Sequence, residues 1–170
     1  AGSRFEKKRA NSKIDGGYFH LTLLAKNFTG YQNLCKLNSR AWLEGFYTKP
    51  RVDHELLREY SEGVIAMSGC LGAQIPRTLL DIGEDAGDAM LQQYLDIYKD
   101  NFFIELQNHV PHNCNHNHGG HNNGEDGRLL ELAEQQTRLN PMLRELANKY
   151  GLAMVATNDG KKKKKEDAKA

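Results

Sequence analysis

One short segment of the sequence concentrates side chains that bind transition metals. Its five histidines and single cysteine fall within thirteen positions: His109, His112, Cys114, His116, His118 and His121. Tracts of this composition bind zinc or nickel. The spacing fits no regular zinc finger, because only one cysteine is present and no strand–helix frame surrounds it. We interpret the tract as a surface insertion, with adventitious metal binding and a dedicated metal site as the alternatives.

A second set of reactive side chains is defined by position. Cys70, His109 and Asp159 each come shortly after a short apolar run that is typical of a buried strand. Where strands alternate with helices, polar residues just past the strand ends collect at one face, and that face holds the chemistry. The alternative is that the polar residues beside them simply mark turns.

The elements that would position these residues alternate along the chain. Apolar runs predict strands over 18–25, 64–68, 102–106 and 152–156. Helical spacing and capping residues predict helices over 29–42, 54–61, 84–99, 128–138 and 140–150. Thr29 opens the first in a capping box with Gln32, and Asp53 caps the second, which Gly63 ends. Asn140 and Pro141 start the last. This order predicts an α/β fold with mainly parallel strands and helices packed outside.

Composition narrows the classes of protein. The 170 residues fit one domain, and 39% hydrophobic residues suffice for an ordinary core. The formal net charge is +1, whereas most surfaces that bind phosphate carry an excess of basic residues. Another domain could supply such a basic surface. No apolar run approaches the roughly 20 residues that span a bilayer. Three cysteines without a secretory pattern favour a reducing compartment, so we expect the cytoplasm and no membrane association.

Several segments resemble the alpha subunit of bacterial DNA polymerase III. They are the opening GSRFEKK and the runs at 20–37, 41–57, 62–77, 101–109 and 151–159. The resemblance is to the polymerase-and-histidinol-phosphatase (PHP) domain of that subunit. It implies part of a distorted (β/α)7 barrel related to metal-dependent phosphoesterases. In active members a metal cluster that includes zinc supports 3′–5′ exonuclease proofreading, and in other members the cluster has decayed.

The resemblance also assigns metal-binding roles to individual residues. His20 in YFHL, Cys70 in SGC and Asp159 in ATND match ligands of the family, and His109 in ELQNH could face the same site. The family places a further histidine ligand where this chain has Lys161. Its remaining ligands fall before residue 1. We therefore expect zinc, or manganese or magnesium, in the parent domain and an incomplete site here. Without the resemblance, the simpler interpretations are a strand histidine, a small buried cysteine and a turn aspartate.

The expected organisation is one partial PHP domain over 1–170. It would comprise an N-terminal loop over 1–17, a His-, Asn- and Gly-rich loop over 110–127 within an insertion, and a lysine-rich tail over 160–170. The absence of an initiator Met favours a piece of a larger protein. The resemblance implies a replicative polymerase fragment that is inactive alone. Its partners would be DNA through the parent polymerase, the remaining polymerase domains and the upstream half of the barrel. The alternatives are an autonomous metal-dependent phosphoesterase and a His-rich metal-binding or interaction module.

Overall fold

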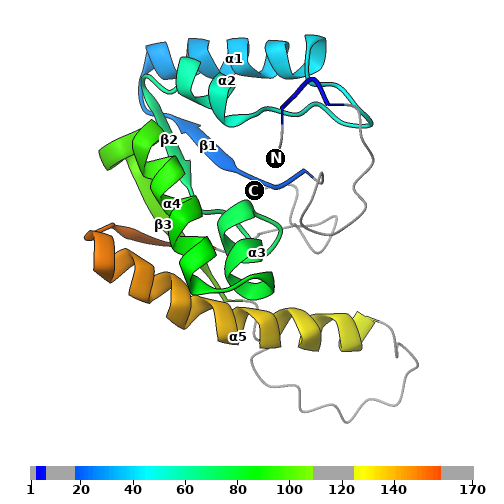
Figure 1. Cartoon of the computed structure of the whole chain (residues 1–170), viewed down its shortest axis with the longest axis vertical. Helices are drawn as coiled ribbons and strands as arrows, with labels where there is room; N and C mark the ends of the chain where they lie inside the picture. Colours follow the sequence, from blue (N-terminus) through cyan, green and yellow to red (C-terminus); the bar gives the residue numbers. More distant parts are fainter. Residues whose placement is uncertain (1–2, 7–17, 109–124, 158–170) are drawn as a thin grey trace, which may run out of the picture.

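Four strands form one mixed sheet in the computed structural model, which describes residues 3–6, 18–108 and 125–157 (Figure 1). The strands are β1 (Thr22–Ala25), β2 (Val64–Met67), β3 (Phe102–Gln107) and β4 (Met154–Thr157). They are ordered β1-β2-β3-β4 across the sheet. Strands β2, β3 and β4 run parallel, whereas β1 is antiparallel to β2. The predicted α/β class is confirmed, and the prediction of parallel pairing holds for three of these four strands.

Helices connect the strands. They are α1 (Phe28–Leu43), α2 (His54–Glu59), α3 (Gln74–Asp81), α4 (Glu84–Tyr98), the short 3-10 helix η1 (Lys99–Asn101) and α5 (Glu125–Tyr150). Helices α1 and α2 lie together near β1, α5 lies at the opposite end, and α3 and α4 lie between them (Figure 1). The described residues form an open sheet rather than a closed barrel.

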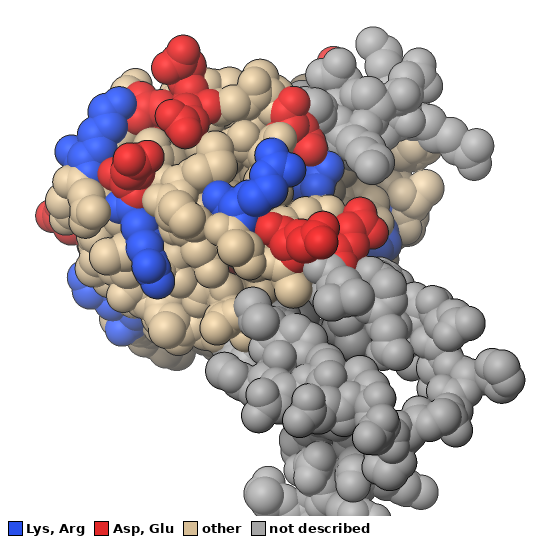
Figure 2. All heavy atoms as spheres, turned by 90° about the horizontal axis from the view of Figure 1, so that it is seen from below, with Lys and Arg blue, Asp and Glu red and all other residues tan. Residues whose placement is uncertain are grey.

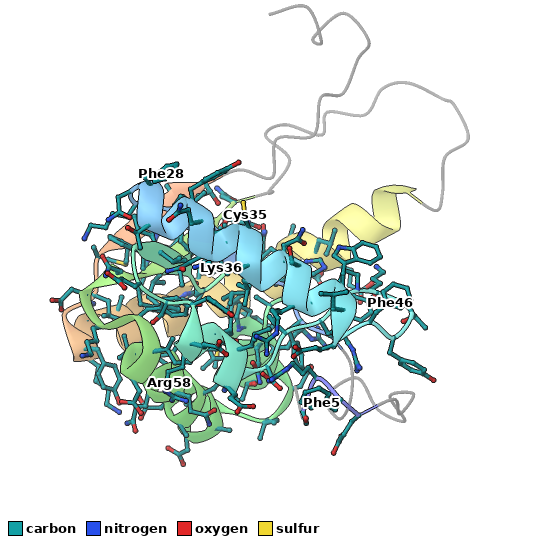
Figure 3. All side chains as sticks on the ribbon, turned by 90° about the horizontal axis from the view of Figure 1, so that it is seen from above. Phe5, Phe28, Cys35, Lys36, Phe46 and Arg58 are labelled. Carbon is teal, nitrogen blue, oxygen red and sulfur yellow. The ribbon has the colours of Figure 1, made fainter. Side chains whose placement is uncertain are left out.

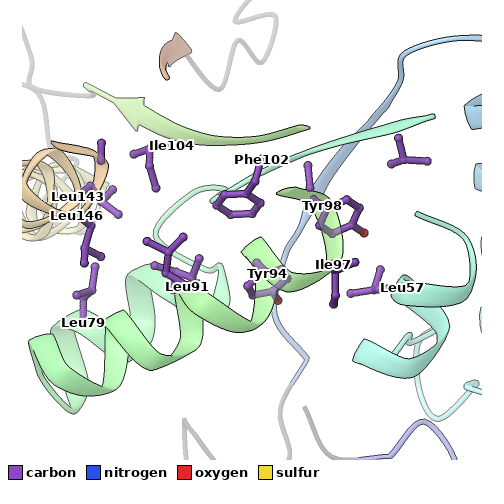
Figure 4. Packing of buried hydrophobic residues seen from close by; sticks show 14 of the residues in the cluster. Leu57, Leu79, Leu91, Tyr94, Ile97, Tyr98, Phe102, Ile104, Leu143 and Leu146 are labelled. Carbon is purple, nitrogen blue, oxygen red and sulfur yellow. The ribbon is translucent and has the colours of Figure 1, made fainter. Parts of the chain in front are cut away.

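One face of the sheet carries the hydrophobic core. Val64 and Ala66 of β2 and Phe102 and Ile104 of β3 are almost fully buried on that face. All five α-helices contribute to the same cluster. Figure 4 shows Leu91 and Tyr94 of α4 between Leu143 on one side and Leu57 on the other. The helical residues of the cluster include Leu37, Leu57, Ile75, Leu79, Leu91, Tyr94, Ile97, Tyr98, Leu139, Leu143, Leu146 and Ala147. Because side chains alternate along a strand, the residues between these positions point to the other face. We call it the inner face.

Side-chain caps set the starts of α1 and α2. Asp53 caps α2 as predicted, since its Oδ1 accepts a hydrogen bond of 3.0 Å from the Leu56 N–H. The prediction that Thr29 opens the preceding helix is wrong. Asn27 is the N-cap, and its Oδ1 accepts from the Gly30 N–H at 2.9 Å. An extended backbone at Asn27 allows this bond, and asparagine ranks above threonine as a cap.

Helix α5 corrects the prediction of two separate helices. It continues through Pro141, which lacks the N–H that an interior helical bond needs. The buried stripe of Leu139, Leu143 and Leu146 passes across this point, while Pro141 itself is exposed on the other side of the helix. Tertiary packing along that stripe outweighs the local break. The first residues of α5 also replace the last three positions of the predicted loop over 110–127.

Three smaller differences concern element bounds. Helix α3 was not predicted, although Pro76 lies in its first turn, where proline is tolerated. Helix α2 ends at Glu59 rather than at Ser61, with Gly63 in the turn before β2. The predicted strand over 18–25 shortens to β1, and His20 makes only an isolated parallel bridge with Ala73.

An arginine anchors residues 3–6 to the helices. The guanidinium of Arg4 contacts Asp53 at 2.9 Å and Glu44 at 2.9 Å, and it is only 7% exposed. The backbone N–H of Arg4 donates to the same aspartate at 2.9 Å. Burial would raise the pKa of Asp53, but hydrogen bonds from Arg4 and Leu56 outweigh it and hold that pKa below its ordinary value. The segment is therefore fastened where α1 ends and α2 begins.

Candidate metal centre

The antiparallel direction of β1 brings its beginning to the ends of the other strands. Thr22 pairs with Met67, the last residue of β2. Strands β2, β3 and β4 all run toward this end of the sheet, and β3 and β4 extend beyond β2, because Met67 pairs with Phe103 while Gln107 pairs with Thr157. We call this end the carboxyl end of the sheet. Residues just before β1 and just after β2 therefore meet there, although they are far apart in sequence.

His20 and Cys70 come into contact at this end. The Nδ1 atom of His20 lies 3.4 Å from the Sγ atom of Cys70. The His20 N–H donates to the Gly72 carbonyl at 3.1 Å, and the Ala73 N–H donates to the Cys70 carbonyl at 2.8 Å. Gly69 has a φ of 81°, which favours glycine and turns the chain away from β2. The turn after β2 thus fixes the backbone on both sides of the thiol.

The spacing of this pair suits a shared soft metal ion. Zinc binds histidine nitrogen at about 2.0–2.1 Å and cysteine sulfur at about 2.3 Å, which places two tetrahedral donors about 3.5 Å apart. The observed 3.4 Å agrees with that separation. A Cβ atom built at Gly72 would lie 3.3 Å from His20 Nδ1 and 3.7 Å from Cys70 Sγ. The glycine therefore leaves open the space beside both donors.

A buried carboxylate lies on the inner face beside the pair. Glu105 of β3 is 5% exposed. Its Oε1 accepts from the Thr157 hydroxyl at 2.5 Å and from Gln107 Nε2 at 2.9 Å, and its Oε2 accepts from the Thr22 hydroxyl at 3.3 Å. Sequence reasoning missed Glu105. The signal available in the sequence was a glutamate inside the apolar run FFIEL. It lies two residues before Gln107, so the two side chains point to the same face of the strand.

The other predicted site residues lie outside the described residues. They are Asp159, Lys161, His109, His112, Cys114, His116, His118 and His121. Thr157, two positions before Asp159, is the last residue of β4 and lies at the carboxyl end of the sheet. Within the described ranges, no three His, Cys, Asp or Glu residues gather closely enough to hold a metal ion. His20 and Cys70 are thus the two predicted ligands whose positions can be compared, and their metal-binding role stays a prediction.

A larger cavity opens on the helix side of β1. It has a volume of about 300 Å³. Aliphatic and aromatic residues line it, together with the polar and charged residues His20, Lys49, Arg51, Asp53, His54 and Gln74. His54 packs edge-on against Tyr94 with ring centroids 5.0 Å apart. Burial lowers the pKa of His54 below its ordinary value, so this imidazole is neutral at pH 7.

Charge does not mark out a nucleic-acid surface on the face shown in Figure 2. Lysine and arginine side chains there alternate with aspartate and glutamate over the described residues. This agrees with the balanced total of 23 basic and 22 acidic residues. None of the described helices is both long and apolar enough to cross a membrane.

Comparison with known proteins places the chain among PHP domains. Residues 3–109 match the family model described as PHP domain. The DNA polymerase III subunit alpha of Thermus aquaticus is 53% identical over 170 residues, which is 100% of this chain and 12% of that protein. The subunits of Deinococcus radiodurans and Treponema pallidum are 44% and 38% identical over 169 residues, which is 99% of this chain and 11% and 12% of those proteins. The chain therefore spans about an eighth of the length of these relatives.

Proposed function

The chain belongs to the PHP domain family, and on that premise we propose that it is part of the PHP domain of a replicative DNA polymerase III alpha subunit. The identity to three such subunits along nearly the whole chain supports this proposal. The open sheet would then be one section of a distorted (β/α)7 barrel. DNA, the remaining polymerase domains and the upstream half of the barrel would be its partners, and the cytoplasm its location.

The observation that carries the metal assignment is the contact between His20 Nδ1 and Cys70 Sγ at 3.4 Å. We propose that these two residues and Asp159 hold a metal ion. A thiolate ligand favours zinc over manganese or magnesium. Asp159 would complete the set because it comes two residues after Thr157 in the sequence, and Thr157 ends β4 at the carboxyl end of the sheet.

A metal ion bound in a complete site polarises a phosphodiester and supplies hydroxide at neutral pH. The residues of this chain would hold that ion with an imidazole nitrogen, a thiolate and a carboxylate. In the parent domain the centre would serve 3′–5′ exonuclease activity. We expect this chain to be inactive, because Lys161 stands where the family has a further histidine ligand. A lysine ammonium has no free lone pair for a cation.

Cobalt(II) titration tests the proposed centre. Cobalt(II) bound to a thiolate absorbs strongly, so a sulfur ligand can be detected directly. The His-rich tract would first be silenced by replacing His112, Cys114, His116, His118 and His121 with serine. In that background Cys70→Ser should abolish the thiolate absorption. Cys35→Ser is the matched control, since Cys35 is exposed on α1 and should leave the absorption unchanged. Equal spectra for all three proteins would refute the metal centre.

An exonuclease assay tests the proposed inactivity and separates the alternatives. The purified chain would be incubated with end-labelled primer DNA and zinc or manganese, and we expect no loss of 3′ nucleotides. Degradation that disappears with Cys70→Ser would instead identify an autonomous metal-dependent phosphoesterase. Metal binding that disappears only when the tract is silenced would identify a His-rich metal-binding module.

A further inference from the structure

Glu105 is a buried carboxylate whose described partners are neutral. The donors are the hydroxyls of Thr22 and Thr157 and the amide of Gln107, and Glu105 itself is 5% exposed. Burying a carboxylate without hydrogen bonds is strongly unfavourable. The three donors therefore stabilise Glu105 where it is, and Glu105 in turn fixes the strands that carry the donors.

Three hydrogen-bond partners of Glu105 each lie two residues from a candidate metal ligand in the sequence. Thr22 lies two residues after His20, and Thr157 lies two residues before Asp159. The Glu105 N–H donates at 2.9 Å to the hydroxyl of Ser68, which lies two residues before Cys70. A single residue is thus bonded to β1, to β4 and to the residue that follows β2. Each bond is two positions from a residue that the metal centre needs.

Helix α5 joins the same hydrogen-bond network through Asn140. Asn140 Nδ2 donates to the Gln107 carbonyl at 3.0 Å, and Gln107 Nε2 donates to Glu105. Cys70, Glu105, Gln107 and Asn140 line one small cleft at the carboxyl end of the sheet. Cys70 therefore lies beside the same polar cluster that joins the strand ends.

We propose that Glu105 is a positioning residue that holds the strand ends so that His20 and Cys70 face each other. The proposal rests on the proposed function, because it gives the pair its metal-binding purpose. Glu105 acts through hydrogen bonds to residues beside the ligands and does not itself bind the metal. Removing such outer partners typically weakens metal affinity about 10–100-fold.

Two substitutions separate this role from general support of the fold. Glu105→Met keeps a similar volume and removes both carboxylate oxygens, whereas Glu105→Gln keeps one side-chain oxygen for Thr157 and Gln107. Ile104→Val is the matched control, since Ile104 is the neighbouring residue, 0% exposed, on the core face. All would be made in the chain with the silenced tract. The readouts are cobalt(II) affinity, melting temperature, and the nitrogen NMR shifts of the His20 imidazole without metal, assigned with His20→Gln.

We expect Glu105→Met to weaken cobalt(II) affinity of the folded chain at least about tenfold and to move the His20 shifts. Glu105→Gln should restore part of both. Ile104→Val should lower the melting temperature and leave affinity and shifts unchanged. Wild-type affinity and wild-type His20 shifts in Glu105→Met would overturn the proposal.

A further variant covers the case in which Glu105→Met does not fold. Thr22→Val removes one donor to Glu105 with little change in shape, and it should move the His20 shifts in the same direction as Glu105→Gln. Unchanged shifts in both would overturn the proposal. If the wild-type chain binds no cobalt(II), the metal centre fails, and the metal-free His20 shifts still decide whether Glu105 positions the pair.

Discussion

Helices α1 and α4 are nearly equal in length, with 16 and 15 residues, yet they present opposite kinds of surface. Helix α4 buries its large side chains, among them Leu91 and Tyr94, against β2 and β3. Helix α1 buries mainly small or polar residues, including Gly30 and Asn33. Leu37 reaches the core, but most of the large apolar side chains of α1 are exposed. Figure 3 shows Phe28 at the start of the helix and Phe46 just beyond its end, both pointing outward.

The difference shows which apolar residues stabilise the described fold. Phe28 is 72% exposed and Leu43 is 83% exposed, so water already surrounds much of each side chain. Trp42 stacks on Phe46, itself 45% exposed, with ring centroids 5.3 Å apart. Hydrophobic stabilisation scales with the apolar area removed from water. The core therefore gains from α4, while the outer side of α1 contributes little to it.

The largest effect should come from shortening a side chain of α4. Leu91 is 0% exposed, and Leu91→Ala should lower the free energy of unfolding by about 2–5 kcal/mol, because it leaves a cavity among packed residues. Urea denaturation would measure the change. Leu43→Ala, the same substitution on α1, is the control and should change stability by less than about 0.5 kcal/mol. Similar losses in the two variants would erase the distinction between the helices.

A smaller loss is expected where the inner side of α1 touches backbone. A Cβ atom built at Gly30 would lie 1.8 Å from the Gly63 carbonyl oxygen, so the first turn of α1 needs glycine there. We expect Gly30→Ala to destabilise the fold by about 1–3 kcal/mol, the usual range for overpacking. Differential scanning calorimetry would detect it as a lower melting temperature. A melting temperature at or above that of the wild type would show that α1 is not held against the turn before β2.

Acid should weaken the contact between α2 and α4. The pKa of His54 is lowered by burial, so in the folded state its neutral form is favoured. The stability that this gives is complete above the unfolded pKa of about 6.5 and is lost as the pH falls below it. The melting temperature should therefore decrease between pH 7 and pH 5, and His54→Phe should reduce the slope. An unchanged slope in that variant would assign the decrease to other groups.

The smallest effect should follow from removing an exposed aromatic ring. Trp42 is 55% exposed, and Trp42→Ser should change the free energy of unfolding by less than about 0.5 kcal/mol. Binding of a hydrophobic dye should decrease, since the exposed apolar area becomes smaller. A loss of several kcal/mol would instead mean that the outer side of α1 is packed in solution.

Local pattern predicted much of the fold. The strand predicted over 64–68 and the helix predicted over 84–99 match β2 and α4 within a residue, and Asp53 caps α2 as expected. The direction in which strands pair could not be predicted from local pattern, because nothing in the residues of β1 indicates that it pairs antiparallel to β2. The break predicted at Pro141 was local as well, whereas the buried stripe that overrides it depends on tertiary contacts.

The candidate site was less accessible from the sequence. Cys70 was singled out by its position after a predicted strand, while His20 was assigned from a resemblance, since a histidine within a predicted strand is ordinarily a structural residue. Their contact arises from the antiparallel pairing, which spacing does not reveal. Glu105 escaped notice because alternation within a strand suggests an exposed residue at that position. Its three donors come from β1, β3 and β4, so only the folded sheet identifies it as buried.

The reversed direction of β1 also has a consequence for the order of folding. His20 and Cys70 are 50 residues apart, and α1 and α2 lie between them. No short hairpin joins them, so the imidazole and the thiol meet only when β1 pairs with β2 across the connection that contains both helices. Contacts between residues so far apart in sequence form slowly, because the intervening loop loses conformational entropy before the contact contributes any stabilisation. During synthesis the two donors would stay apart until β2 has emerged, and an ion captured by both would mark a chain that has already folded.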